Sequence, residues 1–108
     1  MLILVKERIS EGDLKKAAED LDGYIKFVVD VEKEILTAGG LRHVEGEELL
    51  LKEDSKQKDL WGGGLDLETG EMDFDSMINL RPSENPSREV LSAEIRDKIE
   101  KIVEKLLK

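Results

Sequence analysis

The first quarter of the chain changes from a continuous apolar run to an amphipathic pattern. Leu2–Val5 is apolar throughout and bounded by charge, which is typical of a strand buried on both faces. After Ser10, a residue type that caps helices, apolar side chains recur with helical spacing as far as Leu21, and Gly23 is placed to end the helix. We therefore expect a short strand followed by a helix over residues 11–22.

From Tyr24 the period of the pattern changes to two. Apolar residues alternate with charged ones as far as Ile35, which predicts one strand with one face toward water. The Gly-Gly pair at 39–40 is a hairpin-type turn signal, so Leu41–Val44 is predicted to be a short return strand. Residues 45–53 are better described as one or two helical turns, and a strand there is the open alternative.

A second hairpin is predicted around the turn sequence Glu-Thr-Gly-Glu, because Leu67 and Met72 flank it. If those two residues pair directly, the apolar positions of both strands fall on one face, which supports this register. The apolar face then holds Trp61, Leu65, Leu67, Met72, Phe74 and Ile78. The opposite face holds Asp66, Asp73, Asp75, Asn79 and, just beyond the strand, Arg81.

The last part of the chain predicts a loop and a helix. Pro82 has no N–H to donate, so it should end the second hairpin, with a loop over 83–87. Ser92 can cap a final helix whose apolar stripe is Ile95, Ile99, Ile102, Val103 and Leu106. The order β-α-β-β-α-β-β-α predicts an α+β domain over residues 1–108, with a mostly antiparallel sheet and helices packed on one face.

The composition indicates where the protein works more clearly than what it does. Charged residues make up 40 % of the chain and the net charge is −9, which disfavours binding to nucleic acid. The absence of Cys fits a reducing cytoplasm, and the apolar start is too short for a signal sequence or a membrane span. The scarcity of Asn and Gln beside abundant Glu and Lys is typical of hyperthermophile proteins.

Two carboxylate pairs are candidates for metal or acid–base chemistry. Asp30 and Glu32 share the polar face of one predicted strand, and Asp73 and Asp75 share that of another. If these strands are neighbours, four carboxylates converge and a metal-dependent hydrolase becomes an alternative; the simpler interpretation is a solvated acidic face. His43, the only His, stands near Glu45, Glu47 and Glu48, but one imidazole without Cys is a poor metal set. We predict no metal site and no cofactor, and leave open whether the protein is an enzyme.

The Gly62–Gly64 triplet lacks the Lys-Ser/Thr of a phosphate-binding loop and does not precede a helix. A bulge or a close approach by another element is favoured, and a space for a ligand beside Trp61 is the alternative.

The most suggestive polar set is Asn79, Arg81, Asn85 and Arg88, which surround a Pro-containing loop. Guanidinium groups hold planar anions with two hydrogen bonds, and Asn amides add neutral donors and acceptors. The set predicts an anion-binding loop; the structural alternative is that the Arg side chains pin the loop to acids of neighbouring strands. The function that follows is a small cytosolic binding module, as a monomer or a homodimer, for an anionic small molecule or protein segment.

Four runs resemble a small prokaryotic family known only as a domain of unknown function: VVDVEKEI (Val28–Ile35), SKQKDLWG (Ser55–Gly62), DSMINLRPS (Asp75–Ser83) and NPSR (Asn85–Arg88). The chain departs from that family at Gly63-Gly64, where a larger residue and Asn are usual, and in a shortened loop around Asn85. The resemblance implies a small single-domain cytoplasmic protein and brings no activity.

Overall fold

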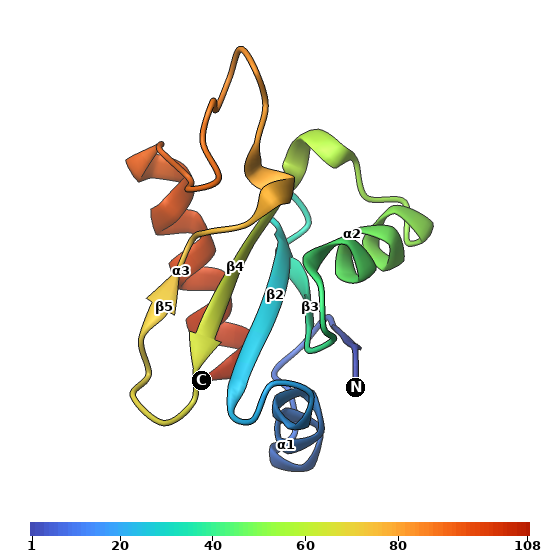
Figure 1. Cartoon of the computed structure of the whole chain (residues 1–108). Helices are drawn as coiled ribbons and strands as arrows, with labels where there is room; N and C mark the ends of the chain where they lie inside the picture. Colours follow the sequence, from blue (N-terminus) through green and yellow to red (C-terminus); the bar gives the residue numbers. More distant parts are fainter.

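A five-stranded antiparallel sheet with three α-helices forms the structure, a computed structural model that describes residues 1–108 (Figure 1). Across the sheet the strands lie in the order β1-β3-β2-β4-β5. The predicted α+β class and order of elements are confirmed. In chain order the elements are β1 (Ile3–Val5), α1 (Glu11–Glu19), β2 (Tyr24–Asp30), β3 (Ile35–Ala38), α2 (His43–Lys52), β4 (Leu60–Asp66), β5 (Met72–Asp73) and α3 (Ala93–Leu107), with short 3-10 helices η1 (Gln57–Asp59) and η2 (Met77–Asn79).

The two faces of the sheet are covered unequally. β2 is covered on both faces, and alternate residues contact different helices: Val29 belongs to the larger core with α1 and α3, and Val28 packs with Leu50 of α2. The prediction that helices pack on one face therefore holds for α1 and α3 and is wrong for α2, which covers the other face (Figure 1). No helix combines the length and the apolar character that crossing a membrane requires.

The predicted single strand over 24–35 is in fact the β2–β3 hairpin. The buried carboxylate of Asp30 accepts hydrogen bonds from the N–H groups of Glu32 and Lys33, at 2.9 and 2.8 Å, which shapes a turn. Glu34 completes the turn with a positive φ of 57°. Alternation continues across this turn, so the pattern of apolar residues alone did not reveal it.

The predicted return strand at Leu41–Val44 is wrong, because the chain enters α2 there. Gly39 and Gly40 adopt the positive φ angles that the turn signal predicts, but they lead from β3 into a helix. The side chain of Glu45 accepts the N–H groups of Leu41 and Arg42, which satisfies donors at the start of α2. The helical interpretation of residues 45–53 is confirmed, with the helix starting two residues earlier.

The other helices follow their predicted caps. Ser10 accepts the N–H of Asp13 and Ser92 accepts that of Ile95. α1 ends at Glu19 instead of residue 22, and the stripe of α3 is buried from Ile99 to Leu106.

The β4–β5 hairpin is shifted by two residues from the predicted register. Leu65 pairs with Met72, because the turn closes earlier, with the N–H of Gly70 donating to the carbonyl of Asp66 at 2.7 Å. A shift of two keeps every side chain on its predicted face, so Trp61 and Phe74 do contact the larger core. Ile78 does not; β5 ends at Asp73, and Ile78 packs on the α2 side.

Candidate functional site

Asn79 and Asn85, two members of the predicted anion set, are buried and bind backbone groups. Asn79 accepts the N–H of Gly62 at 2.8 Å and donates to the carbonyls of Gly62, Phe74 and Arg88 at 2.9–3.1 Å. It thereby fastens both ends of the segment 74–88 to β4. Asn85 accepts the N–H of Leu91 and donates to the carbonyls of Asn79, Ser87 and Glu89. Both amides build the loop.

The two Arg side chains of the set lie in different places. Arg81 donates to the carbonyls of Gln57, Lys58 and Leu60, and its guanidinium lies 3.7 Å from the centre of the Trp61 ring. Burial lowers the pKa of Arg81. Arg88 makes an ion pair of 3.2 Å with Asp75, which follows β5. The anion site at all four residues stays a prediction, and of the four only Arg88 lines the largest cavity.

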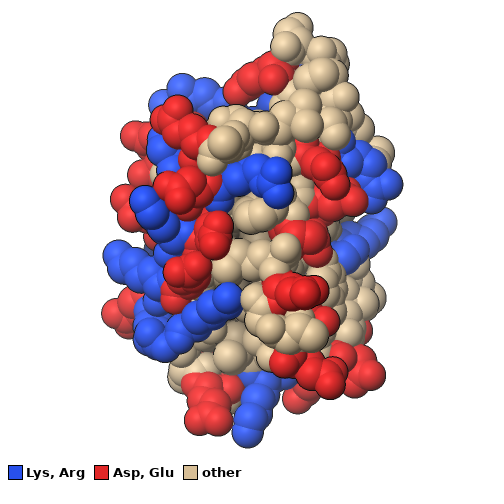
Figure 2. All heavy atoms as spheres, turned by 90° about the vertical axis from the view of Figure 1, so that its left-hand side faces the viewer, with Lys and Arg blue, Asp and Glu red and all other residues tan.

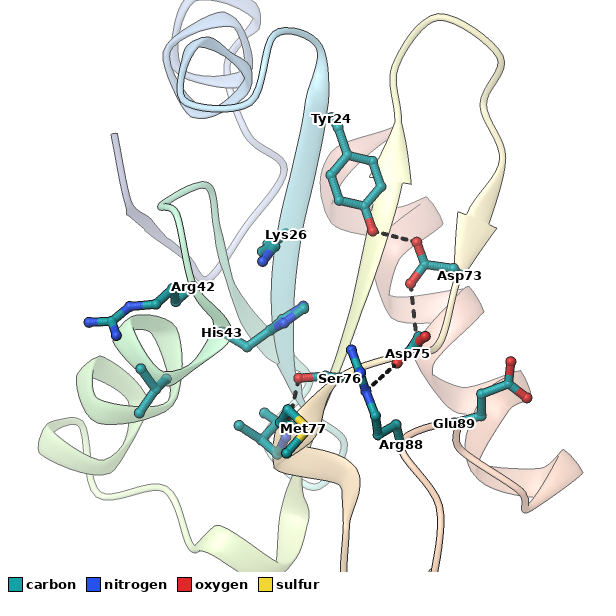
Figure 3. A pocket seen from close by; sticks show the side chains of 12 residues that line it. Tyr24, Lys26, Arg42, His43, Asp73, Asp75, Ser76, Met77, Arg88 and Glu89 are labelled. Carbon is teal, nitrogen blue, oxygen red and sulfur yellow. Dashed lines mark hydrogen bonds and ion pairs between the residues drawn. The ribbon is translucent and has the colours of Figure 1, made fainter.

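That cavity has a volume of about 630 Å³ and lies on the α2 side of the sheet (Figure 3). One wall carries Lys26 of β2 and Arg42, the residue just before α2. The other wall carries Asp73 of β5 and, beyond it, Asp75 with its partner Arg88. The cavity is therefore bounded by opposite charges that come from separate segments of the chain.

The glycine triplet of β4 lets other side chains pack against the strand. A Cβ at Gly64 would lie 1.7 Å from the Tyr24 hydroxyl, and one at Gly62 would lie 2.8 Å from the Ser76 hydroxyl and 3.0 Å from His43 Cδ2. The favoured prediction of a close approach by other elements is confirmed. Gly62 and Gly64 thus make room for the side chains of Tyr24, Ser76 and His43, which line the cavity.

Tyr24 reaches across Gly64 and donates its hydroxyl hydrogen to Asp73 (Figure 3). Burial, and then the hydrogen bond and charge of Asp73, raise the pKa of Tyr24 well above its usual value. The other carboxylate oxygen of Asp73 accepts the N–H of Asp75 at 3.2 Å. Asp73 therefore sits in the cavity with hydrogen bonds but without a cationic partner.

His43 is fixed in one orientation at the start of α2. Its Nε2 lies 2.7 Å from the carbonyl of Gly63, which can only accept, so Nε2 carries the hydrogen. Burial lowers the pKa of His43, which favours the neutral ring. Nδ1 then keeps a lone pair without a protein partner; it is accessible to solvent, and His43 lines the cavity.

The strand carboxylates do not converge as the hydrolase alternative required. β4 separates β2 from β5, and Asp30 lies opposite Leu60, whereas Asp73 lies opposite Gly64. Four residues along a strand correspond to about 13 Å. Asp30 is moreover buried, with Ser55 donating to it at 2.6 Å. No group of three or more His, Cys, Asp or Glu side chains is arranged to hold a metal ion, so the geometry of this alternative is absent.

Tyr24, Lys26 and Arg42, on which the chemistry of the cavity depends, were not singled out from the sequence. Tyr24 and Lys26 could be placed on one strand face, but only the pairing with β4 shows that Gly64 makes room beside them. Arg42 belonged to a segment predicted as a strand, which hid its position before a helix.

The raised pKa of Tyr24 predicts a loss of stability at alkaline pH. The unfolded phenol ionises near pH 10, so this stability is present below about pH 10 and is lost as the pH rises toward the folded pKa. We expect a loss of less than about 1.4 kcal/mol per pH unit, because the ring is partly exposed. Urea titrations of wild type and Tyr24→Phe at several pH values measure it, and the variant should lack the slope.

Tyr24 is the only Tyr, so phenolate absorbance of the folded protein reports it directly. Gly64→Ala serves as a control, since its Cβ displaces the phenol from Asp73 and should lower the titration midpoint. A wild-type midpoint near the ordinary value would contradict the expectation.

One family model matches residues 3–106 of the chain, and its description is "Protein of unknown function (DUF5674)". No curated protein and no solved structure matches.

Proposed function

The chain belongs to this family of unknown function, and from the residues that line its cavity we propose that the protein is a small binding module. The module holds the anionic group of a ligand at Lys26 and Arg42, and Arg88 lines the facing wall of the same cavity. One observation carries the proposal: Lys26 and Arg42 both line the cavity, and neither belongs to any of the five ion pairs of the protein.

Most Lys and Arg side chains of this chain belong to no ion pair, so what sets Lys26 and Arg42 apart is that both line one cavity in a chain with 26 acids and 17 bases. Elsewhere on the surface, basic side chains lie among acidic ones, as Figure 2 shows for one side of the molecule. On α3, for example, Lys101 lies 3.0 Å from Asp97. Lys26 and Arg42 have no carboxylate partner, so their charge is available to a ligand, although Figure 3 shows the guanidinium of Arg42 at the rim of the cavity, pointing away from Asp73 and Asp75. A guanidinium adds directed donors.

The residues predicted from the loop keep a part in this proposal. Asn79 and Asn85 hold the segment that carries Arg88, so they support the anion site from behind. Arg88 has donors beyond the one that reaches Asp75, because a guanidinium has five. The ligand would be an anionic small molecule or the acidic end of a protein segment, met in the cytoplasm.

Thermal unfolding with inorganic phosphate or citrate tests the proposal. At about ten times the dissociation constant, a bound anion stabilises the folded state by about 1.4 kcal/mol, which corresponds to a rise of roughly 6 °C. We expect this rise for wild type and its loss in Lys26→Met and Arg42→Gln. Lys105→Met is the matched control, because this exposed residue belongs to α3 on the other face and makes no ion pair.

The response of the variants decides between sites. Equal stabilisation of wild type and Lys26→Met would overturn the proposal. A separate hollow beside Arg81 is also lined by Lys58 and Glu84. If Arg81→Lys loses the response and Lys26→Met keeps it, the anion binds in that hollow.

A further inference from the structure

We propose that the ligand is a small zwitterion, with its anionic group at Lys26 and Arg42 and a primary amine at Asp73 and Nδ1 of His43. This inference rests on the proposed anion site and adds the second charged group of the ligand.

The placement of opposite charges follows from the sheet. Lys26 pairs with Gly64 and Gly64 pairs with Asp73, so the three residues form a row across β2, β4 and β5. Paired residues point to the same face, which puts the ammonium of Lys26 and the carboxylate of Asp73 on the cavity side. Their Cα atoms are two strand spacings apart, about 10 Å, and the space over Gly64 holds the Tyr24 phenol, which donates to Asp73, so a ligand that joins the two charges passes over Tyr24.

Asp73 offers the charge that an amine requires. Each of its carboxylate oxygens accepts one hydrogen bond from the protein, from Tyr24 and from the N–H of Asp75, and each retains a further lone pair. The neighbouring cation, Arg88, is paired with Asp75. Asp73 is therefore a partly buried carboxylate without a counter-ion inside a cavity.

His43 adds a neutral acceptor beside this carboxylate. Its Nε2–H is held by the carbonyl of Gly63, so the free Nδ1 can only accept. A primary ammonium has three donors and no acceptor, which matches Nδ1, the Asp73 carboxylate and the remaining lone pair of the Tyr24 hydroxyl. A metal ion is a poorer fit, since no three such ligands converge here.

Matched pairs of probes separate the amine from the anion. Phosphoethanolamine and ethyl phosphate differ by the amine, as do β-alanine and propionate. We expect titration calorimetry to show that each amine-bearing probe binds at least about tenfold more tightly than its partner. Asp73→Asn should remove this advantage while leaving ethyl phosphate binding intact, and Asp97→Asn on α3 is the control with the same change of charge.

Acidification provides a second measurement. The groups that face His43 are Lys26 on β2, Asp73 on β5 and Asp75 before η2. Protonation converts Nδ1 from an acceptor into a donor, so the advantage of the amine should fall as the pH drops through the lowered pKa of His43. In His43→Gln the side-chain amide can replace Nε2 as a donor but supplies no Nδ1. The preference of this variant for the amine-bearing probe should therefore be smaller than that of wild type and should not change with pH over the same range.

The outcomes distinguish the two proposals. If ethyl phosphate and phosphoethanolamine bind equally well, the zwitterion is overturned and the anion site stands. If none of the four probes binds wild type, the anion site itself fails. An amine advantage that survives in Asp73→Asn overturns the assignment of the amine to this wall.

Discussion

Gly63→Ala is expected to destabilise the protein by about 4 kcal/mol or to prevent folding. The added Cβ would lie 2.3 Å from the backbone carbonyl of Asp73 and 2.8 Å from the ring of Phe27. Phe27 is fully buried, and the carbonyl cannot move without disturbing the pairing of β4 with β5. Relief of the ring contact alone, by adding Phe27→Leu, should not rescue the variant.

Urea denaturation measures this effect, with Gly12→Ala as the matched control. Gly12 lies in α1 with nothing near its Cβ position, so Ala there should stabilise the protein by about 0.5–1 kcal/mol. A cost below about 1 kcal/mol for Gly63→Ala would contradict the close approach that the structure shows.

Asn79→Asp should destabilise the protein by about 4 kcal/mol at neutral pH, although the two side chains have nearly the same shape. The Asp carboxylate can still accept the N–H of Gly62, but it offers no donor to the carbonyls of Gly62, Phe74 and Arg88. Residue 79 is fully buried, so a charge placed among those carbonyls is strongly disfavoured.

The cost of Asn79→Asp should decrease on acidification. Burial beside carbonyls raises the pKa of the new carboxyl in the folded state above its unfolded value near 4. The protonated form, which is favoured at low pH, donates to one carbonyl, so the deficit shrinks as the pH falls through the folded pKa. Chemical denaturation of the variant and wild type at neutral pH and at about pH 5 tests this, and a difference independent of pH would contradict it.

Local signals in the sequence predicted the elements that depend on neighbouring residues. Ser10 and Ser92 mark α1 and α3 correctly, because a cap is a contact over three residues. The turn after Asp30 was missed, because a side chain shapes it in place of Gly or Pro, and Val31 and Ile35 continue the alternation. The start of α2 was missed because Arg42 precedes it where Ser, Thr, Asp or Asn is usual.

The candidate site was less predictable, since it depends on pairing between distant segments. Asn79 and Asn85 stand out in the sequence because side-chain amides are rare in this chain, and in the structure both bind backbone groups that shape a loop. Lys26 and Asp73 become neighbours only through Gly64, on a strand 38 residues after Lys26 in the chain. Such a site needs the register of three strands, which spacing along the sequence does not give.

The two outer strands limit how this sheet can associate with other chains. β1 has three residues and β5 has two, and after β5 the chain turns into η2. Short outer strands expose few unpaired N–H and C=O groups, so they are a poor template for strand addition and for aggregation. A dimer of this protein would have to form through side-chain surfaces, not by joining two sheets into one.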